Sequence, residues 1–274
     1  MRVTVGEPSE FKRLGEAAWL FTLGRFACAL ERTSGAMRGR YLGELTWLEA
    51  EEFLARGWPL LLPIGAGCKE HGHHLPLGND QLLAEGLTRR VLERVEALAL
   101  PTLNYGYYPA FLEYPGSVSL PAQVMSDTVV AICHSLHQQG GRRFYALNTG
   151  VSTVRPLTVA RQQLRDMGID FDFCELGQAI GAVEARLKEQ PGGTHADEME
   201  TSMMLELCPD IVHMEKARPD YHGEIRGSLT RRPDGPGVYS PTGAWGDPTL
   251  ATPAKGKELV GAWVDYVEAR LAHC

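Results

Sequence analysis

Short apolar runs alternate with amphipathic stretches along the chain after about residue 40. The runs are bounded by glycine and proline, as buried strands are. In the stretches between them, apolar residues recur at helical spacing. This pattern predicts strands at residues 59–64, 98–104, 144–148 and 169–174. It predicts helices at residues 81–97, 124–138, 157–167, 179–188, 196–207 and 255–272.

Strands that alternate with helices form βαβ units, so we expect an α/β fold with a mostly parallel sheet covered on both faces. Thr46, followed by Glu49 three residues later, predicts a capping box and one further short helix. Residues 1–40 carry only one weakly amphipathic stretch, and we expect them to form an N-terminal extension to a domain at 41–274. Ligands of such sheets bind beyond the carboxyl ends of the strands. Polar residues that follow strands are therefore the first candidates for a site.

Composition narrows the class of protein. The chain has 274 residues, of which 44% are hydrophobic and 22% charged, as in ordinary globular proteins. A formal net charge of -7 gives no basic field for nucleic acid or an anionic membrane. No apolar run approaches the roughly 20 residues of a membrane span. The six cysteines are scattered without a Cys-x-x-Cys pair. We therefore expect a cytoplasmic protein that acts on a small molecule, without nucleic-acid or membrane partners.

The loop at residues 65–80 concentrates histidines and carboxylates directly after a predicted strand. It holds three histidines together with Glu70 and Asp80. Imidazole and carboxylate ligands suit Zn, Mn or Fe(II), so the loop is a candidate metal site. A solvated polar turn is the alternative interpretation. A dinucleotide-binding loop is excluded, because Glu70 stands where the third glycine belongs and the loop runs into Pro76 rather than a helix.

A second acidic and imidazole cluster opens the helix expected at 196–207. Glu200 follows His195 by five residues, so both can face one cleft if His195 lies where the loop meets the helix. Carboxylates near the start of a helix are favoured by its dipole. That effect alone explains Asp197 and Glu198, which we interpret as capping or surface residues. His195 and Glu200 are the candidate catalytic pair.

Four motifs in the same order along the chain identify a resemblance. The strongest is the Leu-Pro-Ile-Gly sequence at 62–65, followed by His-Gly-His-His-Leu-Pro-Leu-Gly-Asn-Asp at 71–80. The others are Tyr-Pro-Gly-Ser-Val-Ser-Leu at 114–120, His-Ala-Asp-Glu-Met-Glu-Thr-Ser at 195–202 and Gly-Asp-Pro-Thr-Leu-Ala-Thr-Pro-Ala-Lys-Gly at 246–256. From about Gly43 to the C-terminus, the chain resembles the creatininase family of amidohydrolases.

The resemblance implies a three-layer α/β/α fold, assembly into homo-oligomers that are usually hexamers, and a site for one or two divalent ions. It implies that Glu70, His71 and Asp80 are metal ligands, with Asp80 bridging two ions. It makes Glu200 a further ligand and His195 a proton donor or a group that polarises the substrate. We expect a metal-activated water to hydrolyse a carbon–nitrogen bond other than an ordinary peptide bond, in an amide, cyclic amide or formamide.

The chain departs from the family pattern at two positions. The family has Glu, one spacer and His, whereas Glu70 is adjacent to His71, and Lys69 takes the Glu position in a gapless alignment. Gly150 stands where the family has a metal-binding His after Asn-Gly. Three consequences stay open: a single ion, a substitute ligand such as His73 or Cys68, or loss of metal and catalysis. A lyase or isomerase on the same fold, and a catalytically silent oligomeric subunit, are the alternative functions.

Candidate substrate contacts lie in three further segments. An aromatic segment after the second predicted strand, which includes Tyr108, predicts a pocket wall or a subunit contact. Ser152 is expected either to donate a hydrogen bond to substrate or to cap the next helix. Trp245 is expected either to close over the site or to anchor the chain hydrophobically. His73 is a fourth candidate contact.

Overall fold

A five-stranded sheet forms the centre of the domain, with strand order β1-β3-β2-β4-β5. The computed structural model describes residues 37–223 and 227–273, so the N-terminal extension expected at 1–40 lies almost wholly outside the described residues. Each pair of neighbouring strands in the sheet is parallel, as expected. The strands are β1 (Arg40–Tyr41), β2 (Leu60–Ile64), β3 (Leu98–Ala99), β4 (Arg143–Asn148) and β5 (Asp170–Phe173).

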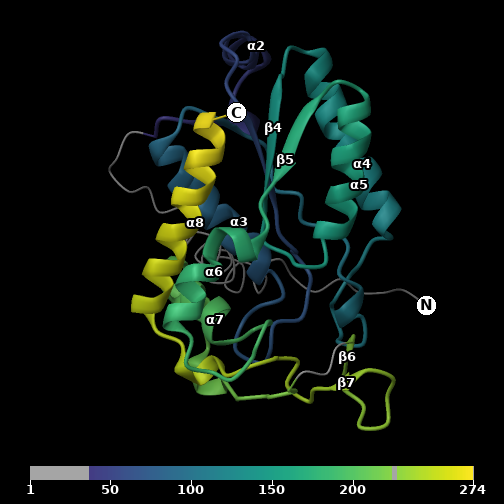
Figure 1. Ribbon diagram of the computed structural model, residues 1–274, viewed down its shortest axis with the longest axis vertical. Helices are drawn as coiled ribbons and strands as arrows, with labels where there is room; N and C mark the ends of the chain where they lie inside the picture. Colours follow the sequence, from purple (N-terminus) through teal and green to yellow (C-terminus); the bar gives the residue numbers. More distant parts are fainter. Residues whose placement is uncertain (1–36, 224–226, 274) are drawn as a thin grey trace, which may run out of the picture.

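Helices cover both faces of this sheet, which confirms the expected α/β architecture of three layers (Figure 1). One face carries α3 (Asn79–Arg94), α6 (Leu176–Leu187), α7 (Glu198–Leu207) and α8 (Pro253–His273). The other carries α2 (Trp47–Ala55), α4 (Ala122–Gln138) and α5 (Val154–Asp166). Short 3₁₀ turns lie at Leu42–Glu44, Pro109–Phe111, Pro209–Ile211, Met214–Lys216 and Pro248–Leu250.

Alternation along the central strands explains why two cores form. Leu60 and Leu62 of β2 pack into the core beneath α4 and α5, whereas Leu61 packs into the core beneath α3 and α8. In β4, Phe144 faces the first core and Tyr145 the second. Successive side chains of a strand point to opposite faces, so a strand buried on both faces is apolar throughout. This is the reason that the strand at residues 59–64 could be recognised as an uninterrupted apolar run.

Two elements differ in extent from the sequence prediction. The strand expected at 98–104 pairs regularly only over β3, because Pro101 has no N–H to donate to a ladder. The chain still follows β2, since Leu103 forms an isolated bridge with Ile64. Helix α3 begins at Asn79 and therefore includes Asp80 in its first turn. The capping box predicted at Thr46 and Glu49 is confirmed at the start of α2.

A second, two-stranded parallel sheet was not predicted from the sequence. It pairs β6 (Leu229–Thr230) with β7 (Val238–Tyr239) and lies away from the main sheet (Figure 1). Leu229 and Val238 form a small apolar cluster with Tyr114, against which Phe111 and Trp245 pack. The described part of the chain contains no helix whose length and apolar character would let it cross a bilayer.

Candidate functional site

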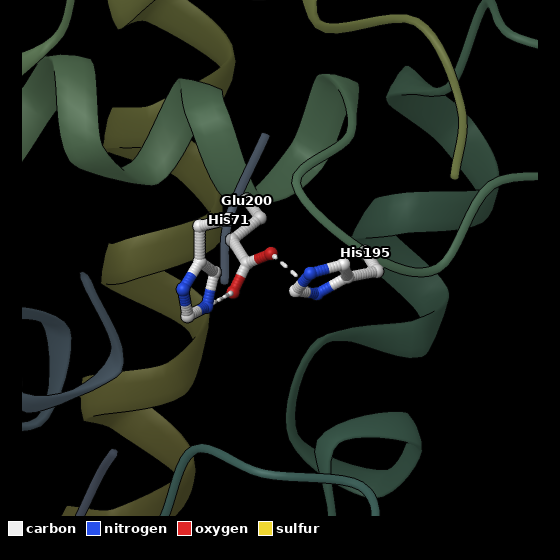
Figure 2. A group of neighbouring side chains, drawn as sticks. All are labelled: His71, His195 and Glu200. Carbon is white, nitrogen blue, oxygen red and sulfur yellow. Dashed lines mark ion pairs between the residues drawn. The ribbon is translucent and has the colours of Figure 1, made fainter. Parts of the chain in front are cut away.

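The residues singled out in the two acidic and imidazole clusters meet at one place. His71 lies in the loop after β2, and Glu200 lies in the first turn of α7, with His195 just before that helix. One possible ligand atom from each of these three residues lies within 4.8 Å of the others. Figure 2 shows the Glu200 carboxylate between the two imidazole rings. Segments far apart in the sequence thus converge as expected.

The hydrogen bonds of His71 fix which ring nitrogen faces the centre. Its Nδ1 donates to the backbone carbonyl of Lys69 at 2.9 Å. Its Nε2 lies 2.8 Å from Oδ1 of Asp80 and 3.4 Å from Oε1 of Glu200. A ring that donates from one nitrogen to a carbonyl presents the other nitrogen as a possible metal ligand.

His195 is held in the same way by a different partner. Its Nε2 donates to Oε2 of Glu70 at 3.0 Å, and its Nδ1 lies 3.7 Å from Oε2 of Glu200. The backbone that follows is unusual, because Ala196 has φ of 47°, in the left-handed region that alanine rarely adopts. This conformation lets the Ala196 N–H donate to Glu200 at 2.6 Å. The chain therefore turns sharply between the His195 ring and helix α7.

Glu200 is fixed by the start of α7. Asp197 is the N-cap and accepts hydrogen bonds from the N–H groups of Met199 and Glu200. The amide of Asn79 donates to Glu200 Oε1 at 3.3 Å. Burial disfavours the charged carboxylate, but His71 and His195 outweigh burial and hold the pKa of Glu200 well below its usual range. Glu200 is therefore an anion that faces both rings.

A buried ion pair adjoins this cluster. Nζ of Lys69 lies 2.6 Å from Oδ2 of Asp80, and the two side chains are 7% and 0% exposed. Burial alone would lower the pKa of Lys69, but Asp80 and Glu200 raise it above its usual value. The same balance acts on Asp80, where burial is outweighed by Lys69 and His71, so that its pKa falls. Lys69 is thus an ammonium inside the protein.

Three further groups in or near the site have shifted pKa values. Burial disfavours protonated His71, but the carboxylates of Asp80 and Glu200 raise its pKa to about 9. A cation that binds at this nitrogen must therefore displace a proton. Burial raises the pKa of Asp197 to about 6. Burial also disfavours the charged form of His74 and lowers its pKa to about 4. Nε2 of His74 is hydrogen-bonded to Thr201 Oγ1 at 2.8 Å.

A cavity of about 530 Å³ opens beside the cluster. Its wall includes His195, Glu200 and Lys69 from the site. Three of the four predicted substrate contacts, Tyr108, Ser152 and Trp245, also line it, together with Phe111, Leu229 and the β4 loop. The hydroxyl of buried Tyr108 has no hydrogen-bond partner among the described residues, and burial raises its pKa. The cavity thus offers polar groups to a bound molecule.

The loop after β4, residues 148–153, contributes no titratable side chain to the cavity. Asn148 folds back on this loop, where its side chain bonds both backbone groups of Gly150. Thr153 donates to Asn148 Oδ1 and Thr149 to the carbonyl of Ile64. A Cβ added at Gly150 would lie 2.9 Å from Thr153 Oγ1. The glycine position is therefore closed by its own loop rather than left open for a ligand.

The remaining predicted residues lie outside the cluster of His71, His195 and Glu200. His73 is exposed and outside the residues that line the cavity, and Cys68 is a partly exposed free thiol that does not line it either. Glu70 accepts from Nε2 of His195, which we call the outer nitrogen of that ring because the other nitrogen, Nδ1, faces Glu200. Glu70 is not part of the cluster of three. The interpretation of Glu198 as a capping or surface residue was wrong, because it is fully buried and pairs with Lys255 at 2.5 Å. The capping role of Asp197 is confirmed.

The cluster of His71, His195 and Glu200 has the chemistry of a site for one divalent ion. Two imidazoles and a carboxylate are common ligands of catalytic zinc. Each ring donates from its outer nitrogen to a carbonyl or carboxylate, which is the usual arrangement around metal-bound histidine. Among residues 37–223 and 227–273, this is the one group of three such ligands within reach of each other.

Comparisons with known proteins agree with these features. The creatininase family model, described as creatinine amidohydrolase, matches residues 43–271. The chain is 34% identical to the creatinine amidohydrolase of Pseudomonas putida over 195 residues, which cover 64% of this chain and 75% of that protein. It is 29% identical to the mycofactocin precursor peptide peptidase of Mycobacterium tuberculosis over 243 residues, which cover 84% and 91%.

Solved structures are similar over most of their length. A zinc–zinc form of a creatininase mutant superposes with a TM-score of 0.73 at 27% sequence identity, covering 85% of this chain and 97% of that one. A manganese form of creatininase superposes with a TM-score of 0.72 at 28% identity, covering 86% and 98%.

Proposed function

The chain belongs to the creatininase family of hydrolases, and from that premise we propose that it is a metal-dependent enzyme that cleaves an amide-type carbon–nitrogen bond in a small molecule. One observation carries the proposal. The inner nitrogens of His71 and His195 both face Glu200, while a carbonyl and a carboxylate engage the outer nitrogens. Two imidazoles held in this way are organised to bind a cation rather than to fill space.

In this proposal His71, His195 and Glu200 hold a divalent ion. Zinc and manganese are the first candidates, since both are named for solved structures of the family. Such an ion, when bound, lowers the pKa of a bound water and polarises the scissile carbonyl. Glu70 acts through His195 by accepting its Nε2–H, which keeps the lone pair of Nδ1 directed at the centre. This assigns Glu70 and His195 roles that differ from the ligand and proton donor expected from sequence.

The wall of the cavity supplies the substrate contacts. Tyr108 offers a buried hydroxyl that has no hydrogen-bond partner within residues 37–223 and 227–273, and Ser152 adds a second hydroxyl. Trp245 and Phe111 supply aromatic surface. These groups suit a compact molecule with a carbonyl and an apolar part. We further propose that the chain forms homo-oligomers, on the strength of the family resemblance alone.

Metal reconstitution tests the function. The purified full chain is stripped with a chelator and loaded with Zn, Mn or Fe(II), and its metal content is measured by elemental analysis. Hydrolysis is then assayed on creatinine, other cyclic amides, formamides and a short peptide, since one relative is named a peptide peptidase. Metal uptake with metal-dependent hydrolysis is expected. A chain that takes up none of the three metals and cleaves none of these compounds contradicts the proposal.

Paired variants separate an enzyme from a silent subunit. Glu200→Gln removes a charged ligand, so metal affinity should fall by more than the roughly 10- to 100-fold that loss of an outer partner costs. Glu206→Gln is the matched control on the same helix, where the residue pairs with Arg90 and does not line the cavity. His195→Ala should lose metal affinity if His195 is a ligand. Retained affinity with a lost rate would instead support the proton-donor role.

A further inference from the structure

We propose that the ammonium of Lys69 takes the place of a second divalent ion, so that the site accepts one metal ion and not two. The inference rests on the proposed function, and it concerns the side of the site that faces Asp80. A related structure carries a zinc pair. The question is therefore what this chain puts where a second cation would be needed.

Asp80 is shared between two cationic positions. Its Oδ1 faces Nε2 of His71 at 2.8 Å, the nitrogen assigned to the metal ion. Its Oδ2 faces Nζ of Lys69 at 2.6 Å. Asp80 thus lies between two cationic positions, the proposed ion at His71 and the ammonium of Lys69, and the second of these is part of the chain.

The surroundings of Lys69 suit an ammonium and offer little else to a metal ion. Its Nζ lies 5.0 Å from the ring centroid of Phe111 and 5.7 Å from that of Tyr108, within the range of cation–π attraction. The β4 loop beside it presents Gly150 and hydroxyl groups rather than an imidazole. Asp80 is thus the carboxylate that Lys69 contacts, and Glu70 is engaged with His195 instead.

Charge balance gives the same answer independently. The carboxylates of Glu70, Asp80 and Glu200 bring three negative charges into a largely buried region. The Lys69 ammonium and a single divalent ion neutralise them when both imidazoles are neutral. A second divalent ion would leave two uncompensated positive charges, which is costly away from water. Replacing Lys69 by a carboxylate would bring four negative charges to the site, which two divalent ions would neutralise.

The test counts metal ions in the full chain and in Lys69→Glu. Elemental analysis after dialysis against excess Mn(II) or Zn(II) should give one ion per wild-type chain and two per Lys69→Glu chain. Electron paramagnetic resonance of the manganese forms should show an isolated ion in the wild type and spin-coupled ions in the variant. Lys255→Met is the matched control, since Lys255 pairs with Glu198 outside the cavity wall and its loss should leave one ion.

Lys69→Met keeps the inference testable if Lys69→Glu does not fold. It preserves most of the apolar stem and leaves Asp80 without its cation, so excess metal should raise its melting temperature more than that of the wild type. Two ions in the wild type, one ion in folded Lys69→Glu, or equal metal responses of Lys69→Met and wild type would each overturn the inference. Two ions in the wild type would leave the proposed function standing, whereas a wild type without any ion would contradict both.

Discussion

The loops after β2 and β4 follow neighbouring parallel strands and reach the same edge of the sheet, yet they differ in chemistry. The β2 loop and the helix after it carry Lys69, Glu70, His71 and Asp80, whose charges are satisfied by one another and by α7. In the β4 loop, Asn148 bonds Gly150 and Thr153, while Thr149 bonds the backbone of Ile64, and none of these side chains is charged. One loop is complete only with partners from elsewhere in the chain, and the other is nearly complete by itself.

This difference indicates where function resides. Parallel strands place both loops in position to bind a ligand, but position alone does not supply metal chemistry. The β4 loop, residues 148–153, carries no imidazole and no carboxylate, so it lacks the usual ligands of a catalytic divalent ion. The β4 loop therefore shapes the cavity, while the β2 loop and the start of α7 hold the charged groups.

Between the two loops, the larger effect is expected when the β2 loop loses Glu70, the hydrogen-bond partner of His195. Glu70→Gln removes the charge that holds Nε2–H of His195, and the amide can donate to that nitrogen, which would turn the Nδ1 lone pair into an N–H. Metal affinity should fall by roughly 10- to 100-fold, as for other outer partners of metal-bound histidine. Isothermal titration with Zn(II) measures this change. Glu113→Gln, at a glutamate paired with Arg232 away from the cavity wall, is the control that should leave affinity unchanged.

A smaller effect, and of another kind, is expected in the β4 loop. Thr153→Val deletes the hydroxyl that bonds Asn148 and so should lower the free energy of unfolding by about 1 kcal/mol. Metal affinity should not change. Urea unfolding and metal titration measure the two quantities, with Thr158→Val on the exposed face of α5 as the control. A loss of affinity as large as that of Glu70→Gln would abolish the contrast between the loops.

The smallest effect concerns the turn that brings α7 to the β2 loop. The left-handed backbone of Ala196 costs about 1 kcal/mol, which glycine would not incur. The greater freedom of glycine in the unfolded chain offsets part of this gain. Ala196→Gly should therefore raise the free energy of unfolding by less than about 1 kcal/mol. Ala131→Gly within α4 should do the opposite, lowering it by about 1 kcal/mol. Thermal or urea unfolding of both variants decides whether this turn is strained.

Most of the fold could be predicted because its signals are local and repeated. A strand buried on both faces is an apolar run, and helices of ten or more residues show their spacing plainly. Two features lacked such signals. The strands β6 and β7 are two residues each, which is too short for a pattern. The segment expected at 98–104 stays beside β2 to the bridge at Leu103, so its apolar pattern gave no sign that regular pairing ends at β3.

The sequence predicted which residues form the site better than it predicted which way their side chains point. His71, Asp80, His195 and Glu200 were expected together, and the structure brings them together. The order Lys69-Glu70 could not say which side chain turns inward, because a shift of one residue in a loop exchanges the two. Burial of Glu198 was missed since its partner Lys255 lies at the start of the last helix, far along the chain.

The contact between Glu70 and His195 joins residues that are 125 positions apart. A ribosome must therefore translate nearly three quarters of the 274 residues before His195 and Glu200 both exist, and a shorter fragment lacks part of the cluster. Under the proposed function, the full ligand set therefore exists only once α7 packs beside the loop after β2.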